Sequence, residues 1–308
     1  MRRTIVPAQA LLKSLASRYR IQHWDTSLPD ARQLAAPDGV GLNYLDWCGS
    51  GEPILFLHGG ALTAHSWDLV CLGLRHEWRC LALDMRGHGD SGWAPEYRVE
   101  TTVDDIATVV THTALERIHI VGNSLGGVVA AHYAAAHPAR VASLTLVDVG
   151  PNLVFESTQT IRDYIERTNG SIDLEAAVDV GMSVDPRIDR DALQYRLLHS
   201  MRQGEDRRLY WKQDRRLMDN HAYFLRKVDE IERLAPRLAV PVLVARGERS
   251  RVFSEDAARR CAALFARGEC VRIENAGHNI QEANPAGLIA ALRGFLVANG
   301  TRADSAFA

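Results

Sequence analysis

Gly122-Asn123-Ser124-Leu125-Gly126 separates a short apolar run from a run of small residues. Residues 117–121, before it, have the length and character of a buried strand, and residues 127–134, after it, those of a helix. A serine between the two lies on a tight strand-to-helix turn, where flanking glycines relieve crowding. Such a turn exposes the serine oxygen and points a helix N-terminus at it. Ser124 is therefore a candidate nucleophile, with an ordinary glycine-rich turn as the alternative.

The composition is that of a soluble globular protein with a large core. The chain has 308 residues, of which 46% are hydrophobic, enough for one large domain or a domain with an inserted subdomain. The net charge of −2 indicates neither a nucleic-acid surface nor a polybasic membrane surface. No stretch has the length and apolarity of a transmembrane span. We expect a monomer or homodimer whose partner is a small-molecule substrate.

The cysteines and the N-terminus bear on the cellular setting. Five cysteines without C-x-x-C spacing are typical of reduced thiols in a cytoplasmic protein. The first 24 residues carry five basic residues and no acidic one, but polar residues interrupt their apolar stretches. That pattern gives no signal-peptide core. We expect residues 1–30 to form an amphipathic extension that packs on the domain or frays.

Strand-like and helical windows alternate along the chain, which predicts an α/β fold with a mostly parallel sheet and helices on both faces. Strands are expected at residues 32–36, 41–47, 53–57, 78–83, 118–121, 144–147, 242–245 and 271–273. Thr102 and Asp105 form a capping-box pattern that predicts a helix start. Asn284-Pro285 predicts the start of the last helix.

One long segment interrupts the alternation. Between about residues 154 and 238 there is no strand-like run, only helical windows rich in charged and aromatic residues. An insertion of this size predicts a helical cap, residues 151–238, over the carboxyl edge of the sheet. Residues 31–150 and 239–300 would then form the α/β core.

Three further segments follow predicted strands, where an acyl-transfer site needs them. The turn His58-Gly59-Gly60-Ala61 can offer the backbone N–H of Gly60 to an oxyanion, beside that of Leu125. His278 lies on the loop after the last strand and can act as a general base. Asp148 ends the strand at 144–147 and can orient that histidine. A tight turn and a structural histidine are the alternatives.

Together these motifs make the chain resemble the α/β-hydrolase family. The matching segments lie between residues 55 and 280 in the family's order: His58-Gly59-Gly60, residues 83–91, residues 122–127 and Gly277-His278. The resemblance implies the α/β-hydrolase fold and the chain order Ser124, Asp148, His278 for a catalytic triad. It implies no cofactor.

The acid departs from the family's commoner pattern. Many members carry an aspartate three residues after the glycine that follows the penultimate strand, and here Ser250 occupies that position after Gly247. Other members take the acid from the end of the preceding strand, which is where Asp148 lies. We therefore expect Asp148 to be the triad acid, with Glu248 or Asp256 as alternatives.

Two other patterns are expected to be structural. Residues 87–92 match G-x-G-x-x-G, but Trp93-Ala94-Pro95 follows in place of the helix that dinucleotide binding requires. Asp84, at a strand end before the nucleophile, is expected to organise its own loop, as in similar proteins. Histidines and acidic residues show no metal-ligand spacing, so no metal is expected.

The predicted cap carries candidate substrate contacts. Residues 202–216 hold six basic and three acidic residues, which could clamp an anionic group or form a solvated face with local ion pairs. Aromatic residues could line an apolar pocket or form ordinary core: Trp67, Trp211, Tyr210, Tyr223 and Phe224. His65 could face that pocket or the surface.

We expect a serine hydrolase that forms an acyl-enzyme from a small carboxylic ester or lactone. In similar proteins, dehalogenase and epoxide-hydrolase chemistry uses an aspartate nucleophile, so Ser124 argues against both. Asn123 resembles the carbon–carbon bond hydrolases of aromatic degradation, which we keep as an alternative. Cofactor-free oxygenase or lyase chemistry and a ligand receptor of the same fold are further alternatives.

Overall fold

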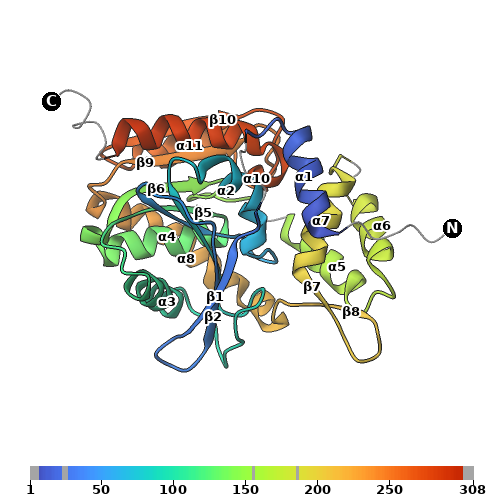
Figure 1. Ribbon diagram of the computed structural model, residues 1–308. Coiled ribbons are helices and arrows are strands. Elements are labelled where there is room, and N and C mark those ends of the chain that lie inside the picture. Colours follow the sequence, from blue (N-terminus) through green and yellow to red (C-terminus); the bar gives the residue numbers. More distant parts are fainter. Residues whose placement is uncertain (1–6, 23–26, 155–156, 185–186, 301–308) are drawn as a thin grey trace.

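A single eight-stranded sheet runs through the centre of the computed structural model, which describes residues 7–22, 27–154, 157–184 and 187–300 (Figure 1). Its order is β1-β2-β4-β3-β5-β6-β9-β10. The strands are β1 (Asp30–Ala35), β2 (Gly41–Asp46), β3 (Pro53–Leu57), β4 (Arg79–Asp84), β5 (Ile118–Asn123), β6 (Val141–Val147), β9 (Val242–Gly247) and β10 (Gly268–Ile273). β2 is antiparallel to both of its neighbours, and the other pairs are parallel. The mostly parallel sheet is confirmed.

Every strand expected from the sequence forms, and β3 has the predicted bounds. The other strands differ from the prediction by at most three residues at either end, which is the usual uncertainty of strand boundaries.

Helices cover both faces of the sheet. On one face α3 (Val99–His112), α4 (Leu125–Ala136), α8 (His221–Leu234) and α9 (Glu255–Ala263) share a buried cluster. On the other face α1 (Ala8–Arg18), α2 (Asp68–Leu74) and α11 (Pro285–Asn299) share a second cluster. Side chains of β3 alternate between the two, since Leu55 and Leu57 join the first and Ile54 and Phe56 the second. The sheet is therefore buried on both faces, as parallel sheets are.

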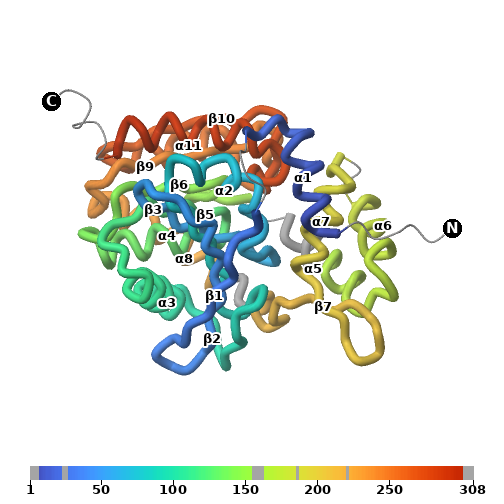
Figure 2. Tube along the Cα trace, in the orientation of Figure 1, coloured from blue at the N-terminus to red at the C-terminus, as the bar shows by residue number. Residues whose placement is uncertain are grey.

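The segment between β6 and β9 contains α5 (Ser157–Thr168), α6 (Leu174–Val184) and α7 (Arg190–Ser200), which share a third buried cluster. Figure 2 shows these helices to one side of the sheet. The segment also contains an antiparallel hairpin of β7 (Met201–Gln203) and β8 (Leu209–Trp211), so the prediction of no strand here was wrong. Two strands of three residues are too short to show an alternating pattern. α8, later in the segment, packs against α4 of the core layer.

The N-terminal helix α1 packs and does not fray. Three of its leucines are buried: Leu11, Leu12 and Leu15. The helix contacts α2 of the core and α7 of the inserted segment. Arg18 pairs with Asp189 and Asp191 at the start of α7, at 2.5 Å each. α1 therefore bridges the core and the inserted segment.

One predicted helix start is wrong and another is confirmed. α3 begins at Val99, and Thr102 lies one turn inside it, where its hydroxyl donates to the carbonyl oxygen of Arg98 at 3.0 Å. A threonine inside a helix finds this acceptor four residues back, so Thr102 does not cap. The side chain of Asn284 does cap α11, because it accepts from the N–H of Gly287 at 2.9 Å.

Two other expectations concern the chain as a whole. Within the described ranges, no helix combines the length and the apolarity that a membrane span requires. All five cysteines lie in those ranges as free thiols, and Cys71, Cys80 and Cys261 are buried.

Candidate active site

Ser124 lies on a strained turn between β5 and α4. Its φ of +49° and ψ of −114° fall in a region that non-glycine residues rarely adopt. The flanking glycines are required by close approach of the backbone. A Cβ atom on Gly122 would lie 2.3 Å from the carbonyl oxygen of Gly126, and one on Gly126 would lie 2.3 Å from that of Leu57. The predicted tight strand-to-helix turn is confirmed.

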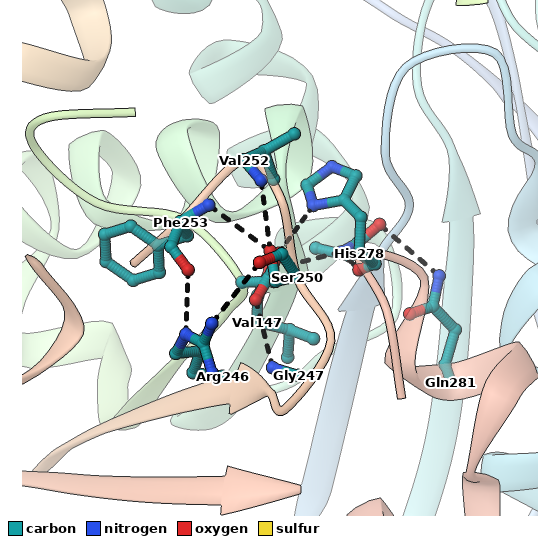
Figure 3. Close-up of polar contacts among 10 residues, drawn as sticks. Val147, Arg246, Gly247, Ser250, Val252, Phe253, His278 and Gln281 are labelled. Atoms are coloured by element: carbon teal, nitrogen blue, oxygen red, sulfur yellow. Dashed lines mark hydrogen bonds and ion pairs between the residues drawn. The ribbon is translucent and has the colours of Figure 1, made fainter. Parts of the chain in front are cut away.

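Asp148 follows β6 with its carboxylate fully buried, and three donors reach it. Oδ2 accepts from His278 Nδ1 at 2.8 Å and from the Ser250 hydroxyl at 2.5 Å, and Oδ1 accepts from the N–H of Gly247 at 3.0 Å. In Figure 3 the His278 ring is directed toward the polar groups around Ser250 and Gly247. A carboxylate only accepts, so the proton of His278 lies on Nδ1 and its Nε2 keeps a lone pair.

Ser250 lies at the position where many family members carry the acid of the triad. Here its hydroxyl donates a hydrogen bond to Asp148, the carboxylate that contacts His278. While it donates to Asp148, its oxygen accepts from the N–H groups of Val252 and Phe253, at 3.3 Å each (Figure 3). The two alternative acids do not contact the histidine. Glu248 accepts from the N–H of Asn275 at 2.9 Å, and Asp256 is exposed on α9. The carboxylate on His278 is that of Asp148.

Asn123 is a site residue whose role the sequence did not reveal. Its side chain is fully buried, and Nδ2 donates to the carbonyl oxygens of Val147 and His278, at 3.1 and 3.2 Å. Gln281, in the short helix α10 (Ile280–Ala283) and labelled in Figure 3, donates to Asn123 Oδ1 at 3.4 Å. Asn123 therefore ties the histidine loop to the end of β6, a contact between segments far apart in the chain.

The loop after β3 lies against the nucleophile turn. A Cβ atom on Gly59 would lie 2.6 Å from Asn123 Oδ1 and 3.5 Å from Ser124 Cβ. The described residues give the N–H groups of Gly60 and Leu125 no hydrogen-bond partner, so both can serve an oxyanion.

His58 holds that loop to the loop after β4. Its Nδ1 donates to the carbonyl oxygen of Gly59 at 2.7 Å, and its Nε2 accepts from the N–H of Met85 at 3.1 Å. Complete burial lowers the pKa of His58 to about 4, so the ring is neutral at neutral pH.

Asp84 organises the segment with the G-x-G-x-x-G pattern. It accepts from the side chain of Asn43 at 2.8 Å and from the N–H groups of Ala64 and Asp90, at 2.7 and 2.9 Å. A Cβ atom on Gly89 would lie 2.3 Å from its carboxyl group. The next helix begins only at Val99, so this segment is the structural turn that was predicted.

A cavity of about 730 Å³ opens over Ser124 and His278. Apolar side chains of the inserted segment form much of its wall, among them Ile188, Leu193, Leu217 and Met218. Of the five predicted aromatic residues, Trp211, Tyr223 and Phe224 line it. Trp67 is buried in the core, which is the alternative that the sequence left open, and Tyr210 is bonded to Asp206 on the hairpin and lies in neither the core nor the cavity wall. Tyr19, just after α1, lines the cavity and was not predicted.

For residues 202–216 the structure supports a solvated face with local ion pairs and not an anionic clamp. The basic residues of the clamp segment are absent from the cavity wall: Arg202, Arg207, Arg208, Lys212, Arg215 and Arg216. Lys212 pairs with Asp90 at 2.7 Å, and Arg208 donates to the carbonyl oxygen of Gly170. They form a solvated face with local partners, because the hairpin turns them away from the cavity.

Five of the described arginines line the cavity, Arg187 among them, and each of the other four is bonded to a neighbour. Arg196 pairs with Glu282 at 3.0 Å, and Arg86 forms a two-pronged pair with Asp105 at 2.6 Å. Arg98 pairs with Glu96, and Arg249 donates to Asn275.

A group of potential metal ligands meets outside this cavity, although no ligand spacing was found in the sequence. His65 lies in η1 (Ala64–Trp67), Asp68 begins α2, and His199 ends α7. One ligand atom of each lies within 4.8 Å of the others. The sequence could not reveal this group, because the inserted segment supplies one of its members. His65 lines a small separate cavity and not the large one.

Comparison with known proteins agrees with this geometry. A family model described as "alpha/beta hydrolase fold" matches residues 52–285. Esterase Rv0045c of Mycobacterium tuberculosis is 31% identical over 280 residues, which cover 87% of this chain and 90% of the esterase. A crystal structure of that esterase superposes with a TM-score of 0.75 at 26% identity, over 96% of this chain and all of the esterase chain.

A second relative is the 2-(acetamidomethylene)succinate hydrolase of Mesorhizobium japonicum. It is 27% identical over 251 residues, which cover 80% of this chain and 89% of the hydrolase. A crystal structure of E-2-(acetamidomethylene)succinate hydrolase superposes with a TM-score of 0.78 at 25% identity, over 87% of this chain and 99% of that one.

Proposed function

The chain belongs to the α/β-hydrolase family, and from that premise we propose that it is a serine hydrolase that cleaves small carboxylic esters or lactones through an acyl-enzyme. Its general activity, that of an esterase-like hydrolase, follows from its relatives. The proposal concerns the residues that perform the reaction and the substrate that they accept.

In the proposed reaction, Ser124 Oγ attacks the carbonyl carbon of the ester while His278 Nε2 takes the hydroxyl proton. Asp148 holds the ring in the required tautomer. The N–H groups of Gly60 and Leu125 stabilise the oxyanion. His278 then returns the proton to the leaving alcohol, and a water molecule activated by the same ring releases the acid.

The observation that carries this proposal is the 2.8 Å contact between His278 Nδ1 and the buried Asp148 carboxylate, beside a cavity that both His278 and Ser124 line. The strained conformation of Ser124 supports a catalytic role, because such strain persists where the surroundings enforce it. Asn123 uses its amide within the protein, so it gives no support to carbon–carbon bond hydrolysis.

For the substrate, we propose an ester whose acyl and alcohol groups carry no charge. The apolar wall and the engaged arginines support this choice. We also propose that residues 151–238 act as the cap that selects the substrate, because their side chains form much of the wall over Ser124.

Labelling with a fluorophosphonate, followed by mass spectrometry, tests the proposal. We expect one phosphonyl adduct on Ser124 in the wild-type protein, and none in Ser124→Ala. Ser50→Ala, at an exposed serine, is the matched control and should label as the wild type does. Hydrolysis of p-nitrophenyl acetate should follow the labelling in all three proteins. An unlabelled, folded wild-type protein that does not hydrolyse the ester would contradict the proposed mechanism.

A further inference from the structure

A second polar cluster lies where the inserted segment meets the core. The core contributes His65 from η1 and Asp68 from α2, and the inserted segment contributes Tyr195 and His199 from α7. The rings of His65 and His199 stack, with 3.6 Å between centroids and 23° between planes. None of the four lines the large cavity over Ser124. The proposed hydrolysis therefore gives this cluster no role.

The hydrogen bonds of the cluster are incomplete. The side chain of Asp68 is only 1% exposed, and its Oδ2 accepts from His65 Nδ1 at 2.7 Å and from the Tyr195 hydroxyl at 2.5 Å. Its Oδ1 has no hydrogen-bond partner among the described residues, and the same is true of His199 Nε2. Both atoms are buried. Buried polar atoms are nearly always bonded, so these two indicate a missing partner.

We propose that His65, Asp68 and His199 bind one divalent transition-metal ion of the Zn²⁺ or Co²⁺ type. Asp68 Oδ1, His199 Nε2 and a ring nitrogen of His65 would be its ligands. One ligand atom from each residue already lies within 4.8 Å of the others. Zinc–nitrogen and zinc–oxygen bonds of about 2.0–2.2 Å place ligand atoms roughly 3–4 Å apart. Binding needs the ligand atoms to approach one another by up to about 1–2 Å, and the stacked rings must splay so that both lone pairs point at the ion.

The surroundings can complete the coordination. A cavity of about 20 Å³ borders the cluster and is lined by His65, Tyr195 and the hydroxyl-bearing residues Thr63 and Ser66. This is about the space that one water molecule needs. Asp68 and His199 do not line this cavity, so a water molecule in it could complete a tetrahedral site only from the side of His65.

The ligand types decide which metal fits. Two imidazoles and one carboxylate suit zinc, cobalt, nickel or copper, whereas calcium and magnesium prefer oxygen ligands throughout. The positive charge of Lys212 acts on both histidines and opposes a cation. That charge is compensated by Asp90, which pairs with Lys212 at 2.7 Å.

A metal at this position would link two parts of the molecule. His65 and Asp68 follow the loop that carries Gly60, and His199 ends the helix α7 of the inserted segment. The ion would fasten α7 to the core beside the proposed oxyanion loop. Because only the folded chain brings the three ligands together, the ion should also stabilise the folded state.

Titration of the chelator-treated full chain with Co²⁺ and Zn²⁺ tests the site. For the wild type we expect one ion per chain by calorimetry and the intense visible absorption of tetrahedral Co²⁺. His199→Gln and Asp68→Asn should each weaken binding at least ~10-fold. His112→Ala, at an exposed histidine on α3, should leave it unchanged. A saturating ion should raise Tm by about 2–5 °C in the wild type and not in the first two variants.

Several results would overturn the proposal. One is wild-type protein that binds no Zn²⁺ at one equivalent, or that gives only the weak spectrum of six-coordinate Co²⁺. Another is equal binding in the wild type, His199→Gln and Asp68→Asn, which would assign the ion to an unrelated surface group. Circular dichroism establishes whether the variants fold. If the variants do not fold, the absorption spectrum of the wild-type protein with Co²⁺ tests the proposal, since an intense tetrahedral spectrum supports it and a weak six-coordinate spectrum contradicts it.

Discussion

The carboxyl edge of the sheet and the inserted segment differ in how their side chains are placed. At the sheet edge, Ser124, Asp148 and His278 each follow a strand; Ser124 and His278 line one cavity, and Asp148 is hydrogen-bonded to His278. In the inserted segment, the sequence left open whether Tyr210 and the basic residues of 202–216 contact the substrate, and the structure places them away from the cavity. Residues placed by the backbone of the sheet are predictable, whereas residues placed by the packing of small helices are not.

The physical reason lies in the range of the interactions. Parallel strands end at a common edge, so a residue that directly follows a strand can occupy only a few positions in space. The helices of the inserted segment are oriented by side-chain contacts with each other, with α1 and with the helices of the core. The five predictions below test this contrast, from the largest expected effect to the smallest.

The largest effect is expected at the strained turn. Ser124→Ala should lower kcat for p-nitrophenyl acetate by ~10⁴–10⁶-fold, because no other group can form the acyl-enzyme. Tm should change little, since the alteration removes one oxygen. Steady-state kinetics and calorimetry on the same preparation measure both. A variant with a tenth of wild-type activity would refute the role of Ser124.

The acid should follow in size. Asp148→Asn should lower kcat by ~10⁴-fold, because an amide cannot hold His278 in the required tautomer. Ser250→Ala should cost only ~10-fold, because it removes one of three donors to the carboxylate. Glu248→Gln is the control and should behave as the wild type. A severe loss in Glu248→Gln, together with a mild one in Asp148→Asn, would transfer the role to Glu248.

The loop after β3 should be sensitive to acid. Burial lowers the pKa of His58 from 6.5 to about 4, so the unfolded chain binds this proton more tightly than the folded one. The neutral ring therefore contributes to the free energy of unfolding. This contribution is complete above the pKa of His58 in the unfolded chain and is lost as pH falls from about 6.5 to 4. It amounts to about 3 kcal/mol.

Urea unfolding at several pH values measures this loss. In His58→Gln, the amide oxygen can still accept from Met85. The free energy of unfolding of this variant should change less between pH 6.5 and 4 than that of the wild type. If the free energy of unfolding depends on pH equally in the two proteins, other titratable groups are responsible for the loss of stability in acid.

A smaller effect is expected at Tyr19, where α1 reaches the cavity. Tyr19→Ala should enlarge the pocket and raise kcat/KM for longer acyl chains relative to acetate by ~3–10-fold. Turnover of the acetate itself should stay the same. Arg20→Ala, at the exposed neighbour, serves as the control. An unchanged chain-length profile would show that Tyr19 has no part in substrate choice.

The smallest effect is expected on the hairpin. Arg207→Glu combined with Arg208→Glu should change KM for acidic and neutral esters by less than about twofold, because neither side chain lines the cavity. Stability should stay within about 0.5 kcal/mol of the wild type. A KM that rises for acidic esters alone would restore the clamp and weaken the contrast drawn above.

By itself the sequence determined the sheet, the nucleophile turn and the candidate triad. These depend on signals that are local in the chain, such as the apolar run at 53–57 or the glycines on either side of Ser124. Gly122 and Gly126 are informative because the backbone leaves no room for a Cβ atom there.

Only the tertiary structure decided which carboxylate meets His278, what Ser250 does and where Tyr19 lies. It also decided that His65, Asp68 and His199 meet. Each of these contacts joins segments far apart in the chain through side-chain atoms. Such pairings are settled by the packing of whole elements, because close-packed side chains leave only particular neighbours within bonding distance. The sequence pattern of one strand or helix does not predict such contacts.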